Sequence, residues 1–398
     1  MCIALIAVIG FSMTACNDDD NFGNLDASWF QLIHPDQDSY IIVKGNGEPP
    51  VNVMIPATYK GLAVTHIGGG AFLDCANLKS VTIPNSVTSI GGGAFNKCAS
   101  LVSVTMPNSL TSIGDVAFAL CTSLTNVTIP NSVISIGRYA FNGCSELTNV
   151  TIGNSVTSIG EEAFSQCTSL SSATIPNSVT SIGNKAFLSC TSLTSVSIGS
   201  NVTSIGSYAF LNCYNLASVV VNENNQTYAS QDGILYNKAK NQCILIPTKI
   251  SGDITIPYGV TSIERSAFYL RTITSVTIPN SVTSIGSEAF KLCSSLASVT
   301  IPNSVTSIGS EAFNFCNGLV SVTIGNSVTS IGKEAFCFCT RLVSVTFERN
   351  GNTNIDDTIA FPGDLVTKSG GTGAQNRYGT WTTTRDGSLF GDAYWTKQ

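Results

Sequence analysis

Apolar residues return along this chain with a fixed period of 23 residues. The Ala-Phe pair shows the period most clearly, because it recurs at 23-residue spacing and resumes after one interruption. The phenylalanines of these pairs are Phe72, Phe95, Phe118, Phe141, Phe164, Phe187, Phe210, Phe268, Phe290, Phe313 and Phe336. A period of this length is typical of a solenoid, in which each repeat forms one coil and buries its apolar residues against the neighbouring coils.

Each repeat predicts two extended segments joined by turns. In the repeat from 124 to 146, residues 127–129 read Val-Thr-Ile and alternate apolar and polar positions, which indicates a strand. Pro130 follows and lacks an amide hydrogen, so we expect the strand to end there. Residues 133–136 form a second extended run, and residues 137–141 begin a short helical or irregular segment that closes the coil.

The predicted fold is therefore a β-rich leucine-rich-repeat solenoid of 23-residue coils with a parallel sheet, occupying residues 61–347. Open ends of a solenoid expose apolar surface and unpaired strand edges, so both ends need a cap. We assign residues 27–60 to an N-terminal cap and residues 348–398 to a C-terminal cap or tail.

The regular pattern breaks at an irregular island, residues 222–258. Its short apolar runs are joined by turn residues such as Asp232-Gly233, which predicts hairpins. One interpretation is an enlarged coil kept within the stack. The other is that residues 222–227 project as a recognition loop, since insertions in solenoids map to binding faces.

The repeat consensus Ile-Gly-x-x-Ala-Phe-x-x-Cys-x-x-Leu-x-x-Val-Thr-Ile-Pro resembles the BspA-like leucine-rich-repeat family of bacterial cell-surface proteins. The resemblance covers about residues 67–347, and the motif recurs with little variation. It implies a solenoid on the bacterial surface that adheres to host matrix proteins or to other bacteria. It implies no cofactor and no catalytic residue.

The first residues resemble a lipoprotein signal. Residues 3–11 form an apolar run that is too short to span a bilayer and is typical of a signal-peptide core. Residues 12–16, Ser-Met-Thr-Ala-Cys, resemble a lipobox, although the positive charges that normally precede the apolar run are missing. The resemblance implies a signal peptide over residues 1–15 and a lipid on Cys16. The alternative is an apolar segment that ends in Ala-Cys by chance.

An acidic linker, residues 16–26, follows the proposed lipid attachment point. Its Asn-Asp-Asp-Asp-Asn stretch resembles the signal that exports Bacteroides-type lipoproteins to the outer leaflet. We therefore expect an exported protein, anchored by lipid in the outer membrane and facing the cell exterior. More than one acyl chain is needed for a lasting anchor.

Composition excludes several classes of function. Charged residues make up 11% of the chain, the formal net charge is −6, and lysines and arginines do not cluster. Nucleic acid is therefore not an expected partner, because binding to phosphates requires a basic face. Apolar residues make up 43% of the chain but are dispersed, so no segment is expected to span a membrane and the lipid is the only expected membrane contact.

Cysteine also follows the period. Such spacing gives one thiol per coil, unlike the close pairs of a zinc site, and only Cys337 and Cys339 lie close in sequence. We expect buried free thiols that act as small apolar residues, although stacked coils can bring neighbouring cysteines within disulfide range. The periodic cysteines are Cys75, Cys98, Cys121, Cys144, Cys167, Cys190, Cys213, Cys293, Cys316 and Cys339.

No set of residues predicts catalysis, a cofactor or a metal. The chain has two histidines, His34 and His66, and neither has a Ser-His-acid context. Glu161, Glu162 and Glu311 occupy variable positions before Ala-Phe, where we expect solvated charges. The glycines lack the strand-to-helix context of a phosphate loop. We predict that the chain is not an enzyme.

The outward residue between Val and Ile of each strand is the main candidate for ligand binding. A ladder of hydroxyl groups is polar, uncharged and extended, which suits a fibrous protein, a peptide or a glycan held by many weak contacts. The alternative is that Thr only favours strands and cross-strand hydrogen bonds. The positions, here called the Thr column, are Thr82, Thr105, Thr128, Thr151, Thr174, Ser197, Thr277, Thr300, Thr323 and Thr346.

The tail offers a second, weaker set of candidates. Its aromatic residues suit a cap, or alternatively a platform for a sugar or peptide; they are Tyr378, Trp381, Phe390, Tyr394 and Trp395. Asp357-Thr358-Ile359 resembles the O-glycosylation acceptor of Bacteroides-type surface proteins.

Three functions remain open at this stage. The favoured hypothesis is a cell-surface binding or adhesion module for host matrix, glycan or other bacterial surface ligands. The alternative is a structural spacer or coat component without a specific ligand. Ice binding, suggested by flat threonine ladders, is disfavoured because each strand has one outward Thr. Oligomeric state is not predicted.

Overall fold

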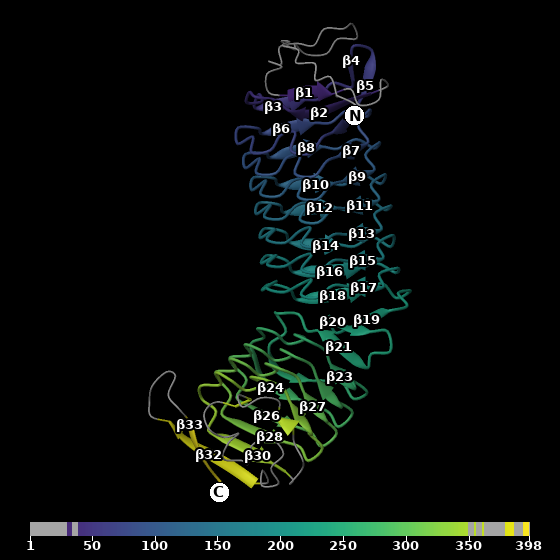
Figure 1. Ribbon diagram of the computed structural model, residues 1–398. Helices are drawn as coiled ribbons and strands as arrows, with labels where there is room; N and C mark the ends of the chain where they lie inside the picture. Colours follow the sequence, from purple (N-terminus) through teal and green to yellow (C-terminus); the bar gives the residue numbers. More distant parts are fainter. Residues whose placement is uncertain are drawn as a thin grey trace, which may run out of the picture. The chain divides into compact units, whose positions relative to one another are not determined.

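The computed structural model describes residues 30–33, 39–348, 354–355, 360–361, 379–385 and 393–397. Cys16 and the lipobox-like segment lie outside the described residues, as do Trp29, Tyr378, Phe390 and residues 357–359. The chain divides into two compact units, one of Met1–Leu216 with Asn222–Gln226 and one of Ala217–Val221 with Thr227–Gln398. Figure 1 shows stacked coils in each unit. They amount to about 13 turns of about 23 residues, which confirms the predicted solenoid.

In unit 1 each regular coil contributes two short strands to two separate columns. The Ser-Ile strands form one continuous sheet, parallel from β2 onward; its members are β1 (Phe30–Ile33), β2 (Ser39–Lys44), β5 (Leu62–Ile67), β7 (Ser89–Ile90), β9 (Ser112–Ile113), β11 (Ser135–Ile136), β13 (Ser158–Ile159), β15 (Ser181–Ile182) and β17 (Ser204–Ile205), with β4 (Thr58–Tyr59) paired to β5. The strands of the Thr column are β3 (Asn52–Met54), β6 (Ser80–Thr82), β8 (Ser103–Thr105), β10 (Asn126–Thr128), β12 (Asn149–Thr151), β14 (Ser172–Thr174) and β16 (Ser195–Ile198).

Unit 2 repeats this arrangement. Its Ser-Ile sheet runs through β19 (Tyr228–Gln231), β20 (Ile234–Asn237), β21 (Gln242–Leu245), β23 (Ser262–Ile263), β25 (Ser284–Ile285), β27 (Ser307–Ile308), β29 (Ser330–Ile331) and β31 (Asn354–Ile355). The remaining strands are β18 (Ser218–Val221), β22 (Gly252–Thr255), β24 (Ile273–Thr277), β26 (Ser298–Ile301), β28 (Ser321–Ile324), β30 (Ser344–Phe347), β32 (Gly379–Arg385) and β33 (Ala393–Lys397).

The strands of the Thr column do not form one uninterrupted sheet, which is a difference from the prediction. In unit 1 the pairing stops between β8 and β10 and again between β12 and β14. In unit 2 it stops between β24 and β26. Pairs within each ladder are parallel and in register, as Val127 with Val150 and Thr128 with Thr151. Every repeat therefore keeps its Thr on the same face despite the breaks.

The core of each unit is a set of ladders made of like side chains. Phe141 and Phe164 are fully buried, and their ring centroids lie 5.3 Å apart with planes 2° from parallel. Along unit 1 the ring separation runs from 4.8 Å at Phe72 and Phe95 to 5.5 Å at Phe187 and Phe210. Offset stacks at this distance are favourable beyond the burial of apolar area. The Leu, Val, Ile and Ala positions of the repeat are buried beside them.

The segment around Ala-Phe is an irregular turn, and no helix occurs in the described ranges. Residues on both sides of Ala-Phe adopt positive φ, as Tyr139 at 56° and Leu120 at 59°. This conformation is uncommon for residues other than glycine. Here it directs amide groups along the stack: the Tyr139 N–H donates to Glu161 O at 2.8 Å, and the Leu120 N–H donates to Asn142 O at 2.7 Å.

Close contact between coils also explains the glycine that follows most Ser-Ile strands, although Glu264 stands there after β23. A Cβ atom on Gly137 would lie 2.5 Å from the backbone carbon of Gly114 in the preceding coil. Such a distance is not possible without moving the backbone, so the position excludes larger residues.

The island contains the expected hairpins. Strand β20 pairs antiparallel with β19 and with β21, and β21 then pairs parallel with β23. In the segment 222–227, Glu223, Asn224 and Gln226 are exposed and Asn225 anchors the segment, so the recognition-loop interpretation stays a prediction. The Asn225 side chain is fully buried, and its Nδ2 donates to Gly199 O at 2.8 Å and to Val202 O at 3.1 Å.

Antiparallel strands stand at the two ends of the repeats. In unit 1, β1 pairs with β2 at the start of the Ser-Ile sheet. In unit 2, β32 pairs with β30, and β33 pairs with β32. Trp381 and Trp395 lie in these last two strands. Each pair gives the end of a ladder a partner strand, which suits the role of a cap.

Replacement of Phe141 with alanine tests the Phe ladder. We expect a loss of about 3–5 kcal/mol in the free energy of unfolding, because a fully buried ring is deleted and both neighbours lose contacts. Urea unfolding followed by circular dichroism measures this loss. Ile134→Thr is the control, since Ile134 is 50% exposed and other coils have Thr there; its effect should stay within about 0.5 kcal/mol. A similar loss for both variants would contradict a core built on the Phe ladder.

Candidate functional site

The Thr column lies on the exposed face of the strands that bear it. Thr82, Thr105 and Thr128 are exposed, while the valines before them face the interior. In-register pairing aligns successive members within each ladder: Thr82 with Thr105, Thr128 with Thr151, and Thr300 with Thr323. Thr174 pairs with Ser197, and Thr277 pairs with Thr255 rather than with Thr300. The structure thus places the predicted site residues on one face of each unit but divides them among several ladders.

Hydrogen bonding separates the Thr column from the other threonines. In the Ser-Ile strand column, the Thr before each Ser uses its hydroxyl to hold two coils together: Thr157 Oγ1 donates to Ile134 O at 3.1 Å, and Thr180 Oγ1 donates to Thr157 O at 3.0 Å. In the Thr column, the hydroxyls of Thr82, Thr105, Thr128, Thr151, Thr174, Thr277, Thr300 and Thr323 make no hydrogen bond to any part of the chain that the structure describes. The cross-strand hydrogen bonds of the alternative interpretation are therefore not formed by these eight residues.

A groove of about 470 Å³ in unit 2, here called the Thr groove, includes two members of the column. It lies where the pairing between β24 and β26 is interrupted. Its polar lining comes from Thr277, Thr300, Ser275, Ser298, Asn280, Asn303 and Glu348.

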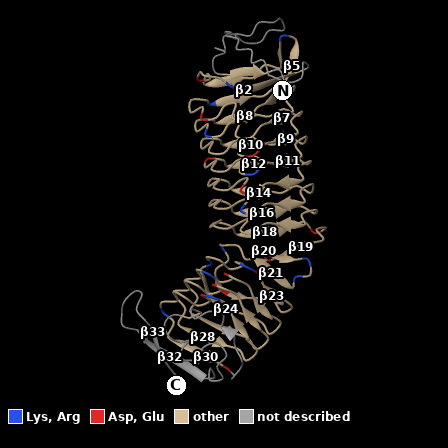
Figure 2. Cartoon of the chain, in the orientation of Figure 1, with Lys and Arg blue, Asp and Glu red and all other residues tan. Residues whose placement is uncertain are grey.

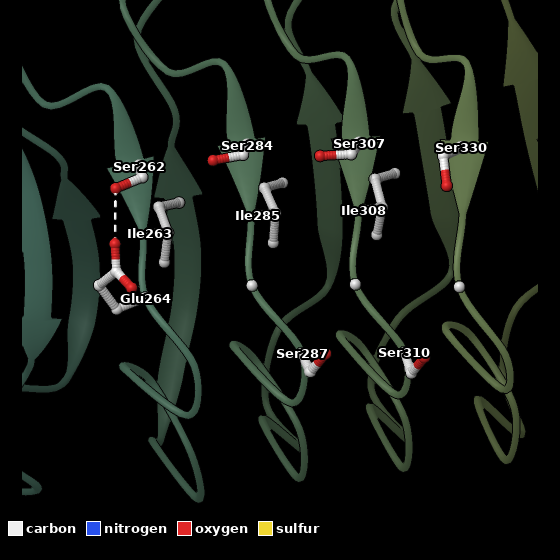
Figure 3. A pocket seen from close by; sticks show the side chains of 13 residues that line it. Ser262, Ile263, Glu264, Ser284, Ile285, Ser287, Ser307, Ile308, Ser310 and Ser330 are labelled. Carbon is white, nitrogen blue, oxygen red and sulfur yellow. Dashed lines mark hydrogen bonds between the residues drawn. The ribbon is translucent and has the colours of Figure 1, made fainter. Parts of the chain in front are cut away.

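A second groove, of about 390 Å³, follows the Ser-Ile strands of unit 2. Figure 3 shows Ser284 and Ser307 on the strands and Ser287 and Ser310 beyond the glycine positions. At one end Ser262 Oγ donates to Glu264 Oε1 at 2.7 Å. This groove is lined by serine, isoleucine and glycine residues and by one carboxylate, that of Glu264. Its polar side-chain groups are therefore hydroxyl groups, apart from this carboxylate.

Charged residues are sparse on the strands. In Figure 2 the Thr-column strands from β8 to β16 carry neither sign of charge, in agreement with their sequences. Charged side chains instead occupy the turns around Ala-Phe, where they pair between adjacent coils. Arg138 lies 3.1 Å from Glu161, and Lys185 lies 3.2 Å from Glu162.

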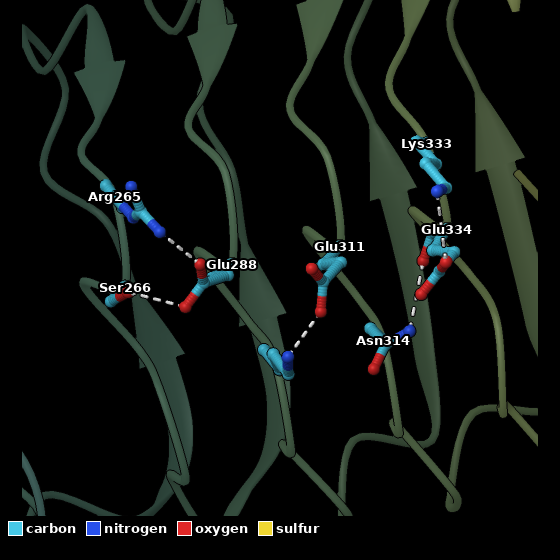
Figure 4. A network of polar contacts seen from close by, with 8 residues as sticks. Arg265, Ser266, Glu288, Glu311, Asn314, Lys333 and Glu334 are labelled. Carbon is cyan, nitrogen blue, oxygen red and sulfur yellow. Dashed lines mark hydrogen bonds and ion pairs between the residues drawn. The ribbon is translucent and has the colours of Figure 1, made fainter. Parts of the chain in front are cut away.

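These pairs correct the expectation of freely solvated carboxylates. Only 14% of the Glu162 side chain is exposed, and its hydrogen bond to Lys185 raises the pKa of that lysine. Figure 4 shows the corresponding network in unit 2, where Glu311 meets Lys291. Partial burial lowers the pKa of Lys291, but the hydrogen bond that Lys291 donates to Glu311 and the charge of that carboxylate outweigh burial, and the net shift is upward. Pairs of this kind are worth about 0–1 kcal/mol each at a surface.

The network in unit 2 alternates cations and carboxylates. Arg265 meets Glu288, and Lys333 meets Glu334 at 3.9 Å. Asn314, which is 1% exposed, donates from Nδ2 to Glu334 O at 3.3 Å. The Arg265–Glu288 and Lys291–Glu311 pairs join adjacent coils, whereas Lys333 and Glu334 pair within one coil.

The cysteines within the described ranges are buried and free, as expected, and most of them have a further role. Cys144 Sγ donates to Phe118 O at 3.2 Å, and Cys167 Sγ donates to Phe141 O at 3.3 Å. The same contact to the Phe of the preceding coil recurs at 3.0–3.3 Å for Cys98, Cys121, Cys190, Cys213, Cys293, Cys316 and Cys339. Burial raises the pKa of the Cys144 thiol to about 12. The thiols therefore act as weak donors that join coils.

Within the described ranges, no three His, Cys, Asp or Glu side chains are arranged to hold a metal ion. None of the segments that the structure describes forms a helix with the length and apolarity needed to cross a bilayer.

Sequence reasoning missed the two features that shape this site. It did not locate the break between β24 and β26, although the repeat that contains β24 lacks one residue before Val276 and has Arg271 in place of Cys. It also did not distinguish the hydroxyls that bond along the stack from those that do not, although the period itself aligns both sets of threonines. Asn280 and Asn303, in the turn after each strand, gave no signal beyond that of ordinary turn residues.

The comparison with family models decides the classification. The model described as "BspA type Leucine rich repeat region (6 copies)" matches residues 61–137, 111–240 and 246–362. The chain belongs to this family. The resemblance seen in the consensus is thereby confirmed. No curated protein sequence is significantly similar to the chain.

Solved structures of bacterial leucine-rich-repeat proteins have the same fold. A leucine rich cell surface protein from Faecalibacterium prausnitzii is 33% identical, with a TM-score of 0.66 over 83% of this chain and 96% of that one. The pneumococcal vaccine antigen PcpA is 19% identical, with a TM-score of 0.58 over 86% of this chain and 90% of its own. A leucine-rich repeat protein from Eubacterium ventriosum is 23% identical, with a TM-score of 0.56 over 80% of this chain and 76% of its own.

Because burial raises the pKa of the Cys144 thiol, we expect the free energy of unfolding to decrease as the pH becomes alkaline. A thiol whose pKa is higher in the folded state favours folding while it is protonated, so its contribution is complete below the unfolded pKa of about 8.5 and is lost as pH rises toward 12. We expect the urea midpoint to fall between pH 8.5 and 11 by less in Cys144→Ala than in the parent chain.

Alkylation provides the control for this experiment. At pH 8 iodoacetamide should leave the buried thiols of the folded protein unmodified and should modify them after unfolding in urea. Rapid alkylation of Cys144 in the folded chain would contradict its burial, as would an equal pH dependence in the two proteins.

Proposed function

We propose that this chain is a cell-surface binding protein that holds an extended polar ligand against its Thr column. The observation that carries the proposal is the contrast between the two sets of threonines. Hydroxyls in the Ser-Ile strand column, such as those of Thr157 and Thr180, are used between coils, whereas Thr128, Thr151 and the six other threonines named with them above leave their hydroxyls to the surroundings. Solenoids commonly use such extended surfaces for recognition.

The surface chemistry supports a ligand held by many weak contacts. The strands of the Thr column bear hydroxyl, amide and methyl groups without charge in unit 1. Repetition of one contact from coil to coil gives avidity, because each further contact of a bound ligand forms at high effective concentration. The cell-surface description of the Faecalibacterium protein, which is 33% identical, supports placement on the cell exterior. The leucine-rich-repeat family acts as an interaction scaffold, which supports binding rather than catalysis.

Anchoring through Cys16 belongs to the same proposal. The Ser-Met-Thr-Ala-Cys segment supplies the attachment point, residues 1–15 the signal peptide, and residues 16–26 an acidic linker to the outer face of the outer membrane. Residues 27–60 and 348–398 would then cap the repeats.

Introduction of positive charges on the Thr column tests binding. Intact chain and a Thr128→Lys, Thr151→Lys, Thr174→Lys variant are compared for saturable binding to immobilised matrix proteins, mucins and intact bacteria. We expect the variant to bind at least about tenfold more weakly, because an unpaired ammonium group is costly to bury against a ligand.

The matched control places the same three charges on the other strand column of the same coils, at Thr157, Thr180 and Thr203. This control should retain binding. Equal loss in both variants would show a general charge effect and would contradict recognition by the Thr column. No binding by the intact chain, together with a disturbed surface layer when the gene is deleted, would favour a structural spacer.

Lipidation is tested by labelling. Cells that process lipoproteins should incorporate labelled palmitate into the parent chain and into Cys2→Ala but not into Cys16→Ala, because only Cys16 follows the lipobox-like residues. Label retained in Cys16→Ala would contradict the assignment.

A further inference from the structure

The Thr groove lies at the break between β24 and β26. Strand β24 pairs with β22, and β26 pairs with β28, but no strand pairing joins β24 to β26. Side chains from both strands and from the turns that follow them line the groove.

The side chains of the groove add donors and acceptors without a cation. In the described part of the chain, the hydroxyls of Thr277, Ser298 and Thr300 have no hydrogen-bond partner. Asn303 accepts the Asn326 N–H at 2.7 Å through Oδ1, which leaves its two Nδ2 hydrogens to face a ligand. Glu348 is exposed at the groove and supplies a carboxylate acceptor. Hydroxyl, amide and carboxylate groups together match the hydroxyl groups of a sugar.

The negative charges at the Thr groove exclude an anionic ligand. The groove is lined by Glu348 and by no lysine or arginine. Asp253 lies next to it, where hydrogen bonds from Ser275 at 2.7 Å and Thr274 at 2.8 Å lower the pKa of its carboxyl group and keep it ionised. Sulfated or sialylated chains would meet two carboxylates without a counter-charge.

The geometry also disfavours an added peptide strand. Strand addition requires a sheet edge with space for another chain. Beside the break, Ala297 N–H donates to Thr274 O at 3.2 Å, so the two coils remain in direct contact and leave no space for a strand between them. A ligand must therefore lie over the groove, on the exposed side of the two strands.

We propose that the Thr groove binds a short neutral oligosaccharide. This inference rests on the proposed function, since it names the ligand class for one part of the Thr column. A volume of about 470 Å³ lies within the range of small-molecule sites, and the polar lining selects a polyhydroxylated ligand over an apolar one. Hydroxyl and amide groups of the lining form the hydrogen bonds to the sugar hydroxyls.

Titration of the full chain with linear neutral oligosaccharides tests the proposal. The probes are gluco-, manno-, galacto- and N-acetylglucosamine oligomers, and the measurement is saturation-transfer NMR followed by calorimetry. We expect saturable binding of at least one of these series and none of sulfated or sialylated counterparts. Thr300→Val and Asn303→Ala should each weaken binding by about 3- to 10-fold, the loss of one hydrogen bond.

Thr306→Val is the matched control. It removes the same hydroxyl in the same coil, but Thr306 Oγ1 donates to Thr283 O at 3.2 Å and lies outside the groove lining. It should bind the oligosaccharide as the parent does, and circular dichroism confirms that all three variants fold. Binding that is unaffected by Thr300→Val and Asn303→Ala overturns the proposal, as does the absence of binding to every neutral series.

The two proposals fail in distinguishable ways. If no neutral oligosaccharide binds while matrix proteins, mucins or cells still bind through the Thr column, the glycan assignment fails and the proposed function stands. If the intact chain binds neither oligosaccharides nor surface material, both fail. Tighter binding of an anionic series would overturn the charge argument and with it the assignment of a neutral ligand.

Discussion

Contact between each coil and its immediate neighbours is the interaction on which the whole structure depends. A constant period places every residue on its own counterpart, so like side chains meet like: Phe141 stacks on Phe164, and Cys144 donates to the carbonyl of Phe118. Backbone hydrogen bonds run the same way, through the strands and through turn residues such as Tyr139. Stability is then a sum of nearest-neighbour contributions. Larger side chains are excluded where coils touch, as at Gly137.

Contact between coils also determines which side-chain groups are left to interact with a ligand. Like charges in register repel, and the turns instead pair opposite charges in adjacent coils, as Arg138 with Glu161 and Lys185 with Glu162. Thiols and the threonines of the Ser-Ile strand column are used between coils. The hydroxyls of eight threonines of the Thr column, Thr128 and Thr151 among them, make no such contact and form the polar surface on which the proposed function rests.

The sequence alone was sufficient to predict the features that depend on the 23-residue period. It predicted the solenoid, the outward direction of residues such as Thr128 and the burial of Cys144, because alternation and spacing decide these directly. It did not predict the positive φ of Tyr139 and Leu120, since that conformation is favoured by hydrogen bonds to the next coil rather than by residue type. The burial of Glu162 and the break beside Thr277 likewise depend on distances between coils, which no single repeat specifies. Cys16 and the proposed lipoprotein signal lie outside the described residues and stay predictions.

Neutron diffraction from a deuterium-exchanged crystal tests the central claim most directly, because it locates hydroxyl deuterium atoms. The account predicts that the Thr157 and Thr180 hydroxyls point at carbonyl groups of the preceding coil, whereas those of Thr128 and Thr151 point at solvent. Deuterium atoms of Thr128 and Thr151 directed at protein acceptors along the stack would contradict the account, because the Thr column would then serve only to hold the coils together.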